Sequence, residues 1–126
     1  MCIRDRDISG NRIPGQGDLS YNIAITKTFL TGSGSVDIRL SRKYSDGGYA
    51  DIWNNERSYI SEVNSGDLLV SYRPNDGDWY VNGFVKNLDD SRDLIYLRAG
   101  SNFQGGNLYG SISEPRTFGL MFGTKF

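Results

Sequence analysis

The sequence contains no histidine and a single cysteine, Cys2. Without histidine the chain lacks the commonest general base, the usual catalytic triads and the usual imidazole metal ligand. One cysteine builds neither an internal disulfide framework nor a thiolate zinc site. We therefore expect a protein that is not an enzyme, with no catalytic residues, no metal and no cofactor.

An excess of charge of one sign is also missing. The chain has 14 basic and 15 acidic residues, giving a formal net charge of −1, and its basic residues are scattered singly. Such a chain offers no basic surface to a phosphate backbone, so nucleic acid is not an expected partner. Long apolar runs are absent too, since the longest are short pieces such as residues 94–97. A membrane-spanning helix needs about 18 apolar residues, and the sequence offers no candidate for one.

The first six residues, MCIRDR, look like the translation of a transposon end sequence that is used to prepare sequencing libraries. We interpret residues 1–6 as an artefact and leave them out of the fold reasoning. The alternative is a true start codon followed by a short polar lead. On the first interpretation the reading frame was cut upstream, and residues 7–126 are a fragment of a longer protein.

What the sequence does have is β composition, with 16 glycines spread among Ser, Thr, Asn, Asp and Tyr. Over residues 19–29 the odd positions are mostly apolar and the even positions are small or polar. Alternation with a period of two predicts a strand with one apolar and one polar face. The same alternation predicts further strands over residues 36–44, 68–73, 79–87 and from 115 to the end. The expected fold class is all-β, with five antiparallel up-and-down strands.

The connections between these strands alternate in length. Residues 30–34 and 74–78 are short turns, whereas 45–58 and 88–114 are long, and the start of the second (RDLIYLRA) is open to continuing the fourth strand. Short turns at one end and long loops at the other are typical of outer-membrane barrels. A five-stranded sheet without a helix also has nothing to pack its apolar face against. We expect an open curved sheet that forms the end of a transmembrane β-barrel, although a soluble meander with one wet face would alternate in the same way.

Side chains at the strand ends fit a membrane interface. Aromatic residues gather where strands meet connections, as an interfacial girdle requires; the predicted girdle is Phe29, Tyr44, Tyr72, Trp79 and Phe126. Arg42 and Lys27 interrupt the apolar face near opposite ends of the predicted sheet. A charge on a lipid-facing surface costs little at the interface, so we expect both at the rims, where Arg42 either meets lipopolysaccharide phosphates or reaches water. The polar face carries paired charges such as Asp37 and Arg39, which suits a hydrated lumen.

Four segments together resemble the C-terminal end of TonB-dependent outer-membrane receptors. They are residues 10–14 before the first strand, 75–79, 85–90, and 114–119 followed by alternation to a terminal Phe126. The resemblance implies a barrel of about 22 strands around a plug domain, in the outer membrane of a Gram-negative bacterium, taking up scarce ligands such as iron–siderophore complexes. It implies as partners the outer-membrane lipid and lipopolysaccharide, the missing plug and remaining strands, and the TonB complex through the missing N-terminal region. It also makes Phe126 the signal for the barrel-assembly machinery.

The long connections hold the candidate ligand-binding residues. Their aromatic rings could stack on a ligand and their polar groups could bind it by hydrogen bonds; these residues are Tyr49, Trp53, Asn55, Arg57, Asn102, Phe103 and Tyr109. The alternative is that both connections are solvated loops. Two acidic clusters, within residues 46–56 and 89–93, lack the spacing of a calcium loop, and we expect a solvated surface there.

Two other functions fit the sequence. A soluble antiparallel β domain could bind carbohydrate through its loop aromatics, and another outer-membrane barrel, such as a porin or adhesin, would show the same strands. The apolar side chains separate the soluble domain from a barrel. In a barrel they line one exposed face, whereas in a soluble domain they pack against a second sheet; they are Leu19, Ile23, Ile25, Val36, Ile38, Leu40, Phe118, Leu120 and Phe122.

Overall fold

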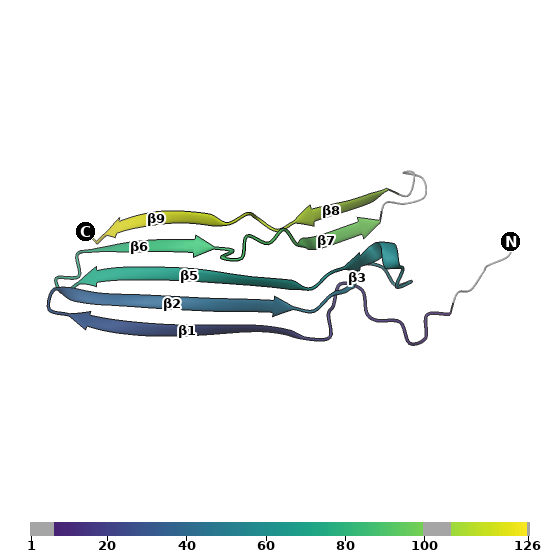
Figure 1. Cartoon of the computed structure of the whole chain (residues 1–126), viewed down its shortest axis with the longest axis horizontal. Coiled ribbons are helices and arrows are strands. Elements are labelled where there is room, and N and C mark those ends of the chain that lie inside the picture. The colour runs from purple at the N-terminus through teal and green to yellow at the C-terminus, as the bar shows by residue number, and fades with distance from the viewer. Residues whose placement is uncertain (1–6, 100–106, 126) are drawn as a thin grey trace. The chain divides into compact units, whose positions relative to one another are not determined.

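The structure, a computed structural model, describes residues 7–99 and 107–125 (Figure 1). The chain divides into two compact units, which we describe separately. The sheet unit comprises residues 20–44, 64–92 and 113–126, and the loop unit comprises residues 1–19, 45–63 and 93–112. Almost all regular structure in the described residues is β-strand, and none of their helices is long and apolar enough to cross a membrane.

The sheet unit is built on one antiparallel sheet of five strands in the order β1-β2-β5-β6-β9 (Figure 1). Sequential strands are neighbours throughout, so the topology is up-and-down, as predicted. The strands are β1 (Ser20–Thr31), β2 (Gly34–Ser45), β5 (Val63–Pro74), β6 (Trp79–Lys86) and β9 (Thr117–Thr124). β1 and β9 form the two edges of the sheet. The predicted third strand, residues 68–73, is only the end of β5, because its first half lacks clean alternation.

Two tight turns lie side by side at one end of the sheet. Gly77 adopts a φ of 72°, a conformation that favours glycine, and its N–H donates to the Pro74 carbonyl at 3.1 Å. Asn75 joins this turn to the one between β1 and β2, because its side-chain amide donates to the Gly32 carbonyl at 3.0 Å and its N–H to the Ser33 carbonyl at 3.1 Å. The two long connections leave the strands at the opposite end.

The register of the sheet places the apolar residues on one face. Val85 lies opposite Leu68 on β5 and Phe118 on β9, and partners in an antiparallel pair share a face. At the other side of the sheet, Tyr21 of β1 stacks on Tyr44 of β2 with ring centroids 5.2 Å apart. Alternation along each strand then assigns the rest of this apolar face: Ile23, Ile25, Val36, Ile38, Leu40, Val70, Tyr72, Trp79, Val81, Leu120 and Phe122.

The opposite face carries polar and charged side chains. The Thr28 hydroxyl donates to Asp37 Oδ1 at 2.6 Å, and Arg73 Nη1 lies 3.6 Å from Asp37 Oδ2. Asp37 therefore pairs with Arg73 and not with Arg39 as expected. The physical reason is spacing: residues two apart along a strand are separated by two rises of about 3.3 Å, whereas the neighbouring strand lies about 4.8 Å away.

No hydrophobic side chain among the described residues is buried. On the apolar face Leu120 is 83% exposed, Phe118 80% and Ile25 68%. Within the sheet unit, the described residues form no second sheet against which this face could pack. An open apolar face of this size exceeds the scattered exposed hydrophobics that are normal on a soluble monomer.

The loop unit holds more regular structure than the predicted loops. It contains β3 (Gly48–Tyr49) paired with β4 (Tyr59–Ile60), β7 (Leu94–Ala99) paired with β8 (Leu108–Ile112), and a 3-10 turn, η1 (Glu56–Ser58). Continuation of the fourth strand into residues 92–99 is therefore wrong. β6 ends at Lys86 because Asn87 and Asp90 take left-handed φ angles of 54° and 52°, which strands do not accommodate.

Candidate functional site

In the loop unit, the carboxylate of Asp51 organises the segment around Trp53. It accepts hydrogen bonds from the N–H of Trp53 at 2.9 Å, the N–H of Asn55 at 3.4 Å and the side-chain amide of Asn55 at 3.0 Å. Partial burial raises the pKa of Asp51, but hydrogen bonds from Asn55, Ser58 and Trp53 outweigh it and leave the pKa below its usual value. The ionised carboxylate of Asp51 thus holds the turn around Trp53 by hydrogen bonds.

Five of the seven predicted ligand-binding residues lie in the described part of this unit. Trp53 is 39% exposed, and Arg57 of η1 and Tyr109 of β8 are exposed. Tyr49 has a partner instead, because its ring meets that of Tyr59 edge-on at 5.2 Å. The N–H and side-chain amide of Asn55 both donate to the Asp51 carboxylate. Asn102 and Phe103 lie outside the described residues.

The β7–β8 hairpin lies beside these residues, since β7 contacts both η1 and β4. Its exposed aromatic side chains include Tyr96, which is 50% exposed and was not among the predicted ligand-binding residues. The signal that could have found it is the short apolar run over residues 94–97, which is consistent with a strand. In the described part of the chain, no group of three or more carboxylates, cysteines or histidines is placed to hold a metal ion.

The four predicted girdle residues that the structure describes are divided between the two ends of the sheet. At the end with the short turns, Trp79 lies 5.5 Å from Tyr72 and 6.0 Å from Phe122, between ring centroids. Phe29 is exposed on β1, and Lys27 Nζ lies 6.0 Å from its ring centroid. Tyr44 stacks on Tyr21 at the opposite end, and Phe126 is outside the described residues.

A tight corner follows β6. The Asn87 side chain donates to the carbonyls of Ser91 and Glu114, both at 2.9 Å, and accepts from the Ser91 N–H at 3.2 Å. Its own N–H donates to Asp67 Oδ1 at 3.0 Å. Asn87 is buried, so one amide ties the end of β6 to the chain that enters β9.

Charged groups surround this corner. Asp90 accepts the Arg116 N–H at 2.9 Å, and this hydrogen bond, helped by the charges of Arg116 and Arg92, lowers the pKa of the Asp90 carboxyl. Arg42 Nη1 lies 2.6 Å from Asp89 Oδ2. The Arg42 guanidinium, expected to meet lipopolysaccharide phosphates or water, thus has a carboxylate partner in the chain itself.

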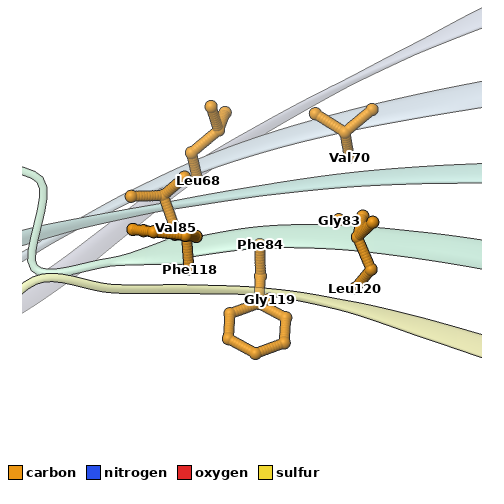
Figure 2. A pocket seen from close by; sticks show the side chains of 8 residues that line it. All are labelled: Leu68, Val70, Gly83, Phe84, Val85, Phe118, Gly119 and Leu120. Carbon is orange, nitrogen blue, oxygen red and sulfur yellow. The ribbon is translucent and has the colours of Figure 1, made fainter.

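The sheet is hollowed on both faces. On the apolar face a shallow hollow of about 290 Å³ lies between β5, β6 and β9; Figure 2 shows the residues that line it, with Phe84 beside Gly119. On the polar face a hollow of about 410 Å³ is lined by Arg39, Ser41, Asp67, Leu69, Phe84, Lys86 and Met121, together with Leu68. Neither was predicted, because each needs the register between strands that are distant in sequence.

Comparison with known proteins shows the fold. No family model matches the chain, and no curated protein matches it. Among solved structures, the chain is similar to the ferric yersiniabactin uptake receptor FyuA from Yersinia pestis, with 18% identity and a TM-score of 0.77. The match covers 91% of this chain and 17% of the receptor chain. The five-stranded sheet therefore has the antiparallel fold found in part of an uptake receptor.

Proposed function

We propose that this chain is part of the β-barrel of a TonB-dependent receptor that takes up a scarce ligand, such as an iron–siderophore complex, across the outer membrane of a Gram-negative bacterium, and that it is not an enzyme. The observation that carries the proposal is the apolar face. It extends over all five strands, is open to its surroundings and lies opposite a polar face. A lipid-facing wall with a wet interior has this distribution.

The length of the strands supports a membrane location. β1, β2 and β5 have 12 residues each, and a tilted strand of about 9–11 residues crosses the hydrocarbon layer. The aromatic cluster of Tyr72, Trp79 and Phe122 then lies at one interface and the Tyr21–Tyr44 pair at the other, where amphipathic rings are favoured.

The proposed partners follow from this location. Lipid and lipopolysaccharide cover the apolar face, while a plug domain and further strands of the same protein complete the barrel. The TonB complex supplies energy, and the assembly machinery reads Phe126. In the loop unit, Trp53, Asn55, Arg57 and Tyr109 contact the ligand from the outside of the cell.

Lipid quenching tests the membrane location. In a Cys2→Ser background, a fluorophore is attached to Ile25→Cys or to Thr26→Cys, and the chain is reconstituted in vesicles of brominated phosphatidylcholine. These neighbours lie on opposite faces of β1 and are both exposed. We expect strong quenching at position 25 and weak quenching at position 26. Equal quenching, or a chain that stays monomeric and compact in water without detergent, would favour the soluble carbohydrate-binding domain.

Uptake is tested on the parent protein. Deletion of its gene should abolish growth on one ferric chelate as the sole iron source, and restoration of the gene should rescue that growth. Unchanged growth on every chelate tried, with quenching at position 25 retained, would leave a porin or an adhesin as the function of the barrel.

A further inference from the structure

The hollow on the polar face collects two positive charges over an apolar floor. We call it the cationic hollow and define it by Arg39, Asp67, Leu69, Phe84, Lys86 and Met121. Its volume of about 410 Å³ falls in the range of small-molecule sites, which are mostly apolar with a few polar groups. The whole hollow belongs to the sheet unit, so its geometry is set by the strands alone.

The charges of the hollow are not balanced. Within the described residues, no ion pair neutralises Arg39 or Lys86. Asp67 is the one acidic residue of the lining, and its Oδ1 is held by the Asn87 N–H at 3.0 Å. The hollow therefore has an excess of one positive charge, which favours an anion.

The apolar floor is fixed by an aromatic ring. Phe84 faces Gly119 across the β6–β9 pair, and its ring occupies the space that a side chain at position 119 would need, since a Cβ there would lie 2.7 Å from Phe84 Cζ. Lys86 Nζ lies 5.8 Å from the centroid of the same ring. A flat group that stacks on Phe84 would thus have a cation within reach.

We propose that the cationic hollow binds a small aromatic carboxylate. Arg39 holds the carboxylate through two parallel hydrogen bonds, Lys86 adds a second positive charge, and the aromatic ring of the ligand stacks on Phe84 with Leu69 and Met121 around it. This site does not rest on the proposed uptake function, because it requires only the register of the sheet.

The probe is 2-naphthoate, and 2-naphthylmethanol is its neutral analogue. The full chain is studied in neutral detergent micelles by equilibrium dialysis, with detergent alone as the blank for partitioning into micelles. Arg39→Gln and Lys86→Gln each remove one charge from the hollow. Lys43→Gln is the matched control, because it removes a positive charge from the same strand and face as Arg39 but outside the lining.

We expect saturable binding of 2-naphthoate that weakens about tenfold in Arg39→Gln, the size of a lost charge-assisted hydrogen bond. Lys86→Gln should weaken it several-fold, and Lys43→Gln should leave it unchanged, with the β-sheet circular dichroism of all three variants intact. The proposal is overturned if the neutral analogue binds as tightly, or if Lys43→Gln weakens binding as much as Arg39→Gln. Either result is independent of where the chain resides, which the quenching experiment decides.

Discussion

The contact between Phe84 and Gly119 allows a quantitative prediction for Gly119→Ala. A Cβ at position 119 would lie 2.7 Å from Phe84 Cζ and 3.0 Å from Cε1, closer than real side-chain contacts. The ring must leave its position, and overpacking of this kind costs about 1–3 kcal/mol. Where space is available, the same substitution in a strand should stabilise by about 0.5–1 kcal/mol, because alanine restricts the unfolded chain more than glycine does.

The decisive experiment is therefore a double-mutant cycle with Phe84→Ala. In the chain that retains Phe84, Gly119→Ala should lower the free energy of unfolding by about 1–3 kcal/mol. In the Phe84→Ala variant, the same substitution should raise it by about 0.5–1 kcal/mol, so the coupling energy between the two positions is about 1.5–4 kcal/mol. The free energy of unfolding is measured by urea titration in neutral detergent, followed by far-ultraviolet circular dichroism. Gly83→Ala is the control, since its Cβ would lie 3.3 Å from the flexible end of Leu120. A coupling below about 0.5 kcal/mol would refute the reasoning.

Three further predictions concern the corner and the loop unit. Asn87→Ala should lower the free energy of unfolding by about 2–4 kcal/mol, because it loses the amide contacts and places alanine at a left-handed φ; Asn87→Gly, measured in the same urea titration, should recover the backbone part. Folding lowers the pKa of Asp90 from its ordinary value of 3.8. The contribution of Asp90 to stability is therefore complete above pH 3.8 and is lost as the pH falls through the folded pKa. Asp90→Asn should remove that part of the acid dependence of the free energy of unfolding, and an unchanged dependence on pH would contradict the prediction. In the proposed receptor, Trp53→Ala should weaken binding of the ferric chelate that supports growth about tenfold in a binding titration. Tyr49→Ala, which breaks a ring contact with Tyr59, should weaken that binding less in the same titration.

The sequence was sufficient for the sheet because the information is local there. Alternation over residues 19–29 and the turn around Gly77 each act within a few residues, so strand number, order and the identity of the apolar face were all predicted. The separation of β7 from β6 was not, because it depends on the left-handed φ angles of Asn87 and Asp90, and asparagine and aspartate are also common in ordinary turns. Whether residues 92–99 continue the fourth strand was therefore left open.

The candidate site was harder to predict from the sequence than the sheet. Tyr49 packs on Tyr59 because β3 pairs with β4, which brings together residues ten apart. Trp53 is exposed on a turn that Asp51 holds by hydrogen bonds. The cationic hollow combines Arg39 with Lys86 and Met121, whose proximity depends on the register of four strands. Composition identifies such residues as polar or aromatic, but only the register brings them together.

The edges of the sheet set a condition on any membrane location. Every second residue of an edge strand points its N–H and C=O groups away from the sheet. The 12 residues of β1 and the 8 of β9 thus present about 20 backbone groups in total, and each one left unsatisfied in hydrocarbon costs several kcal/mol. The total is tens of kcal/mol, far more than the stability of a typical domain. A lipid-embedded sheet of this kind therefore exists only with both edges hydrogen-bonded to other strands, which in vesicles of the isolated chain must come from further copies, so insertion and strand pairing must occur as one event.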